Sequence, residues 1–148
     1  MSLEQKINDG IKAAMLAKDK IRLESLRAVK AEILLVKTSE NAKDFDETAE
    51  IKMLQKLVKQ RREAAEVYAG ASRQELADKE LAEAGIIEEF LPKQLSGEEI
   101  ESALRSIVEE SGARSVKDMG KVMGIASKQL AGKADGKLIA ELVKKILQ

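Results

Sequence analysis

The residues whose types and spacing indicate a possible binding site are mostly glycine and lysine. They gather in the segment DMGKVMGIASKQLAGKADGKLI, residues 118–139. Gly120 and Gly124 stand four residues apart, so on a helix they would share one face and leave it without side chains. Glycine in a helix interior costs about 1 kcal/mol relative to alanine, so the pair indicates that another backbone approaches closely. That backbone belongs either to a neighbouring helix, which is the commoner case and the one we favour, or to a ligand or nucleic acid.

Lysines border this glycine strip. Lys117, Lys121 and Lys128 have spacings that line them up along a helix. A smooth helix face with a basic edge is suited to contact with the phosphates of a nucleic acid.

The segment AGKADGKLI adds Lys133 and Lys137 near the start of the last expected helix, where free N–H groups and the helix dipole favour an anion. The structural alternative is an ordinary turn, in which Gly132 ends one helix and Asp135 caps the next. The residue order does not match a P-loop, so we exclude nucleotide binding.

Charge is balanced over the whole chain, with 26 basic and 26 acidic residues, but it is segregated. Residues 63–111 hold 13 acidic and 4 basic side chains, whereas residues 112–148 hold 8 basic and 3 acidic ones. Such segregation creates local fields that the net charge hides. We interpret the acidic middle as a solvated helix surface and the basic end as the candidate binding surface.

Several classes of function are disfavoured by composition. The chain has no Cys, His or Trp, which removes thiolate and imidazole catalysis and the usual zinc ligands. We find no acid/base pair and no serine cluster with a partner base, so we expect no catalytic residue, no metal and no cofactor. Phe45, Tyr68 and Phe90 stand far apart, so a stacking platform for single-stranded bases is also missing. Any RNA partner should therefore be structured, and we expect no DNA partner.

Nothing in the chain resembles a membrane-spanning or signal segment, because no apolar run is long enough and charge begins at Glu4. We therefore expect a soluble cytoplasmic protein without a membrane partner.

The elements that must position these residues are all helical. One proline, few glycines before residue 110 and abundant Ala, Leu, Glu and Lys predict an all-α protein. Ser2 and Gln5 have the spacing of a capping box at the first helix. Apolar residues then recur at helical spacing to about Lys37. The pattern does not decide whether a new helix begins at Asp19 or the first helix continues. The polar segment 38–48 is predicted to be the loop of a helical hairpin, and the helix from about Thr48 to Ala69 should pack antiparallel on the preceding one.

Two further features concern the middle of the chain. Arg61 falls on the apolar side of its helix, so it should either pair with a carboxylate or carry its charge to an edge of the apolar face. Ser72 and Glu75 have the spacing of an N-terminal cap, and the helix that they open should end near Pro92.

Beyond Pro92, Ser96 and Glu99 form another predicted capping box, and Ser115 and Asp118 are expected to cap the helix that carries the glycine pair. The predicted organisation is thus a long helical hairpin at residues 1–92 and a small three-helix domain at residues 93–148.

The chain resembles the YqeY family over essentially its whole length, and its C-terminal part is similar to the tail domain of GatB. The segments that carry the resemblance are AMLAKDKIRLESLR, KQRREAAEVYAGASRQEL, FLPKQLSGEEI, DMGKVMG and GKADGKLI. GatB is the tRNA-binding subunit of the glutamine-dependent aspartyl/glutamyl-tRNA amidotransferase. The resemblance implies a link to tRNA, and the family label implies a carbon–nitrogen ligase with glutamine as amide donor. GatB's catalytic domain has no counterpart here, so a tail domain alone should bind and not convert.

Three hypotheses follow. The first is a non-catalytic module that binds tRNA or another structured RNA. The second is an adaptor that recruits an amidotransferase or aminoacyl-tRNA synthetase through the hairpin. The third, ranked last, is a carbon–nitrogen ligase. For the first hypothesis the candidate RNA-binding residues are Arg114, Lys117, Gly120, Lys121, Gly124, Lys128, Lys133 and Lys137.

Overall fold

The computed structural model describes residues 1–40 and 42–148, and within them all regular structure is helical. Asn41 lies outside the described residues, although the predicted loop 38–48 includes it. The predicted all-α class is confirmed. The seven helices are α1 (Leu3–Ala17), α2 (Lys20–Lys37), α3 (Glu47–Gly70), α4 (Gln74–Glu88), α5 (Gly97–Ser111), α6 (Met119–Gln129) and α7 (Gly136–Leu147), with short 3-10 turns at Ala42–Asp44 and Val116–Asp118.

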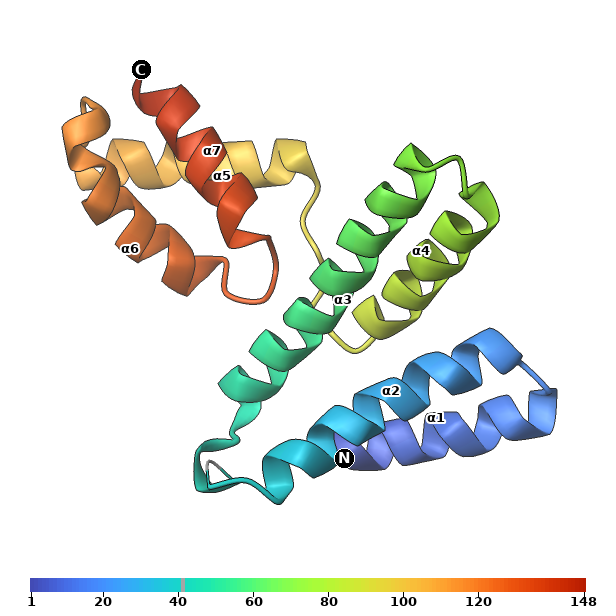
Figure 1. The fold of residues 1–148 in the computed structure, drawn as a ribbon. Coiled ribbons are helices and arrows are strands. Elements are labelled where there is room, and N and C mark those ends of the chain that lie inside the picture. The colour runs from blue at the N-terminus through green and yellow to red at the C-terminus, as the bar shows by residue number, and fades with distance from the viewer. Residues whose placement is uncertain (41) are drawn as a thin grey trace. The chain divides into compact units, whose positions relative to one another are not determined.

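The chain divides into two compact units, Met1–Leu91 and Pro92–Gln148. The first unit holds α1 to α4 and the second holds α5 to α7 (Figure 1). Each unit has a core of its own, so each is described by itself.

The first unit contains two helical hairpins, α1 with α2 and α3 with α4 (Figure 1). The predicted antiparallel packing of α3 on α2 is wrong, because the main partner of α3 is α4. Only residues 71–73 join α3 to α4, and so short a connection forces the two helices to run antiparallel side by side. The longer connection between α2 and α3 imposes no such constraint. The buried core joins Ile7, Leu26, Val29, Ile33, Leu54, Leu57, Val58, Ala84 and Ile87.

The helix ends of the first unit follow the sequence in most places. The Ser2–Gln5 capping box is present at α1. The Asp19 carboxylate accepts a hydrogen bond from the Arg22 N–H at 3.1 Å, so α2 is a separate helix with its own cap. The predicted Ser72 cap is wrong, since Ser72 has a left-handed φ of 60° in the tight turn and α4 starts beyond Arg73 without a side-chain cap.

Ion pairs join the helices of the first unit. Arg22 reaches Glu89 at 2.7 Å, and Lys79 reaches Glu24 at 3.3 Å. The predicted pairing of Arg61 is confirmed, since its Nε lies 3.3 Å from a carboxylate oxygen of Glu83 on α4. Two further pairs, Lys37 with Glu4 and Arg62 with Glu88, join α2 to α1 and α3 to α4.

The second unit closes its core with three helices. Buried side chains of α5, α6, α7 and the turn before α7 meet in one cluster: Ile100, Leu104, Ile107, Val122, Ala126, Leu130, Ala134, Ile139, Val143 and Leu147. The predicted Ser96–Glu99 capping box is present at α5, and Gly112 ends that helix with a left-handed φ of 74°.

The predicted cap by Ser115 and Asp118 is wrong in its detail. Ser115 makes no side-chain cap bond, and the Asp118 carboxylate accepts the Arg114 N–H at 3.0 Å instead. The reason is that the 3-10 turn Val116–Asp118 runs directly into α6, so Asp118 closes the turn before the helix.

Candidate nucleic-acid interface

The face of α6 that carries the glycines points away from the core. Val122 and Ala126 are completely buried against α5 and α7. Gly120, Lys121, Gly124, Ser127 and Lys128 are all exposed. Their spacing places them on the side of the helix opposite the buried pair, as a period of 3.6 residues requires.

Within the second unit, no other helix covers either glycine. A Cβ atom added at Gly120 or Gly124 would have no atom within 4 Å apart from its own helix backbone and chain neighbours. The favoured interpretation, that a neighbouring helix packs on the pair, is therefore wrong for α5 and α7, the other helices of the second unit. The core forms through Val122 and Ala126, which leaves the glycine face as an open and nearly flat strip.

The basic residues at the start of α6 are not equivalent. Lys121 donates a hydrogen bond from Nζ to the Ser111 carbonyl oxygen at 3.1 Å, so part of its role is to close the end of α5. Arg114 and Lys117 are exposed, and neither has an ion-pair partner in the part of the chain that the structure describes. Their charges remain available to a ligand.

The turn between α6 and α7 carries Lys133 and Lys137, both exposed. The structural alternative for this turn is confirmed in part: the Asp135 carboxylate caps α7 by accepting the Lys137 N–H at 3.2 Å. Gly132 has a left-handed φ of 75°, but α6 has already ended at Gln129. Because Asp135 occupies the helix N-terminus, an anion would meet the two lysines there and not the free N–H groups.

Gln94 holds this turn in place, although no pattern in the sequence indicates such a contact. Its side-chain amide donates to the carbonyl oxygens of Gly132 at 2.6 Å and Pro92 at 2.8 Å. The neighbouring Leu95 N–H donates to the Lys133 carbonyl oxygen at 2.9 Å. No spacing rule links residues so far apart in the chain, so only the folded unit shows Gln94 to be a positioning residue.

The eight predicted residues form a strip and not a single cluster. Arg114, Lys117 and Lys121 lie around the start of α6, while Lys128, Lys133 and Lys137 lie at its end and in the next turn. Lys121 and Lys128, the nearest members of the two groups, lie seven residues apart on α6, or roughly 10 Å along the helix axis.

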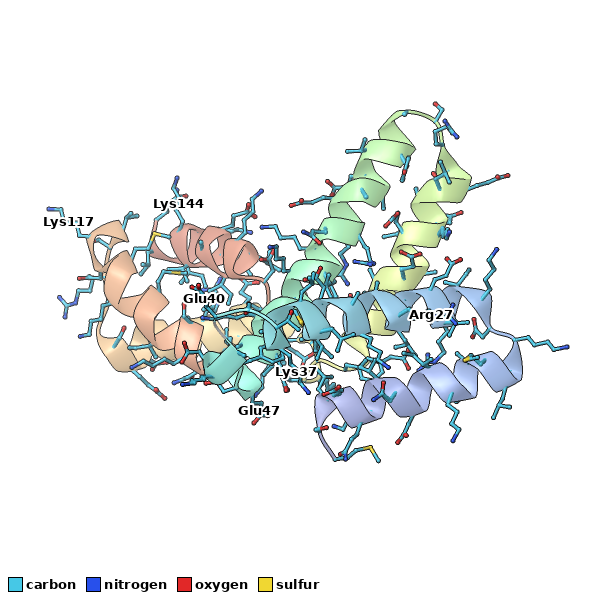
Figure 2. All side chains as sticks on the ribbon, turned by 60° about the horizontal axis from the view of Figure 1, so that its bottom comes forward. Arg27, Lys37, Glu40, Glu47, Lys117 and Lys144 are labelled. Carbon is cyan, nitrogen blue, oxygen red and sulfur yellow. The ribbon has the colours of Figure 1, made fainter. Side chains whose placement is uncertain are left out.

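The end of α7 adds Lys144 and Lys145, which the prediction did not include. Because the short connection returns α7 toward the start of α6, Lys144 lies on the same side of the second unit as Lys117 (Figure 2). Both lysines are exposed, so α7 adds two positive charges to the surface of the second unit.

These features define a helical protein whose second unit has an open, glycine-smoothed and basic face. The chain belongs to the YqeY family: the model of that family, described as Yqey-like protein, matches residues 4–147. The family resemblance inferred from the sequence is thereby confirmed.

Two fungal relatives carry the name Altered inheritance of mitochondria protein 41, mitochondrial. The protein of Pyrenophora tritici-repentis is 28% identical over 143 residues, which cover 93% of this chain and 76% of the relative. The protein of Meyerozyma guilliermondii is 39% identical over 82 residues, or 55% of this chain and 42% of the relative. These names describe the relatives, and the cytoplasmic location expected for this chain stays a prediction.

Two searches of the described residues bear on other kinds of site. No helix among them has the length and apolar character that crossing a membrane requires. No group of three or more acidic, histidine or cysteine side chains there could hold a metal ion.

Proposed function

We propose that the second unit binds structured RNA, tRNA in the first instance, through the open face of α6 and the turn that follows it. The observation that carries the proposal is the empty space above Gly120 and Gly124. Glycine lowers the stability of a helix relative to alanine, and no packing contact within the second unit compensates for this loss at Gly120 or Gly124. A ligand backbone that approaches the helix closely would account for both.

The distribution of positive charge also supports this surface as the RNA-binding site. Lys117 and Lys128 border the glycines, and Arg114, Lys133 and Lys137 extend the basic strip at either end. Contacts from Lys and Arg to phosphates supply most of the sequence-independent affinity for nucleic acid. With few aromatic residues, the surface is suited to the shape and phosphates of a folded RNA and not to unstacked bases.

The choice of tRNA comes from the similarity of the C-terminal part to the tail domain of GatB. That subunit's catalytic domain has no counterpart in this chain, so the proposed role is binding without conversion. Carbon–nitrogen ligase activity, which the family label implies, is not part of the proposal.

The first test is binding of total tRNA across a salt series. If Z phosphates are neutralised, the log of the affinity should fall with the log of salt with a slope of about −0.9Z, and we expect roughly three or more contacts. Joint charge reversal of Lys117, Lys128 and Lys133 should weaken binding strongly and make any residual binding less dependent on salt. No detectable binding at low salt would reject the proposal and favour the adaptor function.

A second test separates the glycine strip from a purely structural role. The changes Gly120→Ala and Gly124→Ala fill open space, so together they should stabilise the second unit by up to about 1–2 kcal/mol while weakening tRNA binding. Gly85→Ala on α4 is the matched control, because its added Cβ also meets nothing within 4 Å and it should leave tRNA affinity unchanged. Unchanged tRNA affinity in the Gly120/Gly124 variant would show that the strip is not a contact surface.

A further inference from the structure

The turn between α1 and α2 exposes apolar side chains that serve neither the core nor the proposed RNA surface. Leu16 is 81% exposed, Met15 is 55% exposed and Ile21 is 37% exposed. The first two end α1 and the third lies in the first turn of α2. These three large apolar side chains therefore lie on either side of the short turn between α1 and α2.

Basic side chains accompany the apolar ones on both sides of this turn. Lys12, Lys18 and Lys20 are exposed, and none has an ion-pair partner among the residues that the structure describes. The one carboxylate within the turn, Asp19, is engaged as the cap of α2 through the Arg22 N–H. With three lysines against this one carboxylate, the net charge at this end of the hairpin is positive.

The geometry is that of a convex tip. Lys18 has a left-handed φ of 56°, and its N–H donates back to the Met15 carbonyl oxygen at 3.2 Å, which stops α1 and reverses the chain. The turn lies at the end of the α1–α2 hairpin (Figure 1). The exposed apolar and basic side chains consequently belong to the closed end of a two-helix hairpin.

We propose that this tip, defined by Met15, Leu16 and Ile21 with Lys12, Lys18 and Lys20, docks reversibly on an anionic phospholipid surface. Apolar side chains at such a tip can enter the boundary between headgroups and acyl chains while neighbouring lysines reach the phosphates. The expectation of no membrane partner was based on the length needed to span a bilayer. A surface contact needs no spanning helix.

Two other classes of partner fit the tip less well. A nucleic acid would use the lysines but would gain nothing from Met15 and Leu16. A stable protein interface buries about 800 Å² on each partner, which three apolar side chains on a convex turn do not supply. A lipid surface uses both the apolar and the basic groups and requires no matching concave shape.

The test uses the full chain and sedimentation with phosphatidylcholine vesicles, with and without phosphatidylserine at about a third of the lipid. We expect binding at least about tenfold tighter to the anionic vesicles at low salt. The joint change Met15→Gln and Leu16→Gln should weaken that binding about tenfold or more. Leu35→Gln is the matched control, because Leu35 is 63% exposed at the other end of α2 and should leave binding unchanged.

Charge is tested separately. Lys12→Glu together with Lys20→Glu should remove binding to the anionic vesicles, whereas Lys117→Glu together with Lys128→Glu in the second unit should not. Circular dichroism confirms that each variant folds. No binding of the unaltered protein to anionic vesicles would overturn the proposal, as would unchanged binding of the Met15/Leu16 variant, which would mean that charge alone attracts the protein.

Discussion

Lys121 and Ser111 join two helices of the second unit: the lysine Nζ donates a hydrogen bond to the serine carbonyl oxygen at 3.1 Å. Ser111 is the last residue of α5, so the contact satisfies a carbonyl at the helix end and places a positive charge at the negative end of the helix dipole. Lys121 thus serves the fold, whereas Lys128 on the same helix has no such contact among the described residues.

This difference predicts two separable phenotypes. Lys121→Gln should destabilise the second unit by about 0.5–1 kcal/mol and also weaken tRNA binding. Lys128→Gln should weaken tRNA binding without a change in stability. Urea unfolding followed by circular dichroism, with amide hydrogen exchange to locate the effect in α5, measures the first quantity. Equal stability losses in both variants would argue against a structural role specific to Lys121.

Gly10 allows α1 and α2 to pack closely. A Cβ added there would lie 2.8 Å from Cδ1 of Leu26, which is completely buried and has little room to move. Gly10→Ala should therefore lower the free energy of unfolding by about 1–2 kcal/mol, since overpacking outweighs the gain in helix propensity.

The control for this prediction is again Gly85→Ala, where nothing lies within 4 Å of the added Cβ. That change should raise the free energy of unfolding by up to about 1 kcal/mol. Denaturant unfolding of both variants measures whether each change lowers or raises the free energy of unfolding. A stabilising effect of Gly10→Ala would mean that α1 and α2 separate more easily than their packing indicates.

Glu83 should make the stability of the first unit depend on pH. Burial raises the pKa of Glu83, the nearby Glu80 raises it further, and Arg61 opposes both effects. The folded state thus favours the protonated form, so the stabilising contribution of this group is complete below its ordinary pKa and is lost as pH rises through the raised pKa. Glu83→Gln removes this dependence.

The measurement is the difference in unfolding free energy between the unaltered protein and the Glu83→Gln variant, followed upward from about pH 4. The unaltered protein should lose stability relative to the variant as pH rises. Arg61→Met removes the opposing cation and should raise the Glu83 pKa further. A difference that does not change with pH would refute the prediction.

The Ser96–Glu99 capping box should respond in the opposite direction. The Ser96 N–H donates a hydrogen bond to the Glu99 carboxylate at 3.2 Å, and this bond, together with the nearby Ser96 side chain, holds the pKa of Glu99 below its usual value. Its stabilising effect is therefore present above the ordinary pKa and is lost as pH falls through the lowered one.

Ser96→Ala removes the side-chain half of that box. It should destabilise α5 by about 1 kcal/mol and let the pKa of Glu99 rise toward its usual value. NMR titration of the Glu99 side chain and urea unfolding measure the two effects. Ser96→Thr, which keeps the hydroxyl, should restore both. An unchanged Glu99 pKa in the alanine variant would show that the backbone bond alone sets it.

Local features of the site could be predicted from sequence because they depend on neighbouring residues. The glycine spacing in α6 and the Asp135 cap are of this kind, and the structure bears out both. The favoured reason for the glycine pair was wrong, because whether a second helix covers a face depends on how α5 and α7 pack. The contact of Gln94 with Gly132 joins distant segments and leaves no local pattern.

By itself the sequence determined the helical class, most of the helix ends and the segregation of charge, since propensity, capping and periodicity act over a few residues. The tertiary structure decided which helices pair: the short turn at residues 71–73 commits α3 to α4 and not to α2. It also decided that the glycine face stays open and that Leu16 is left uncovered. These outcomes depend on which apolar faces meet, and that is settled only when the whole chain packs.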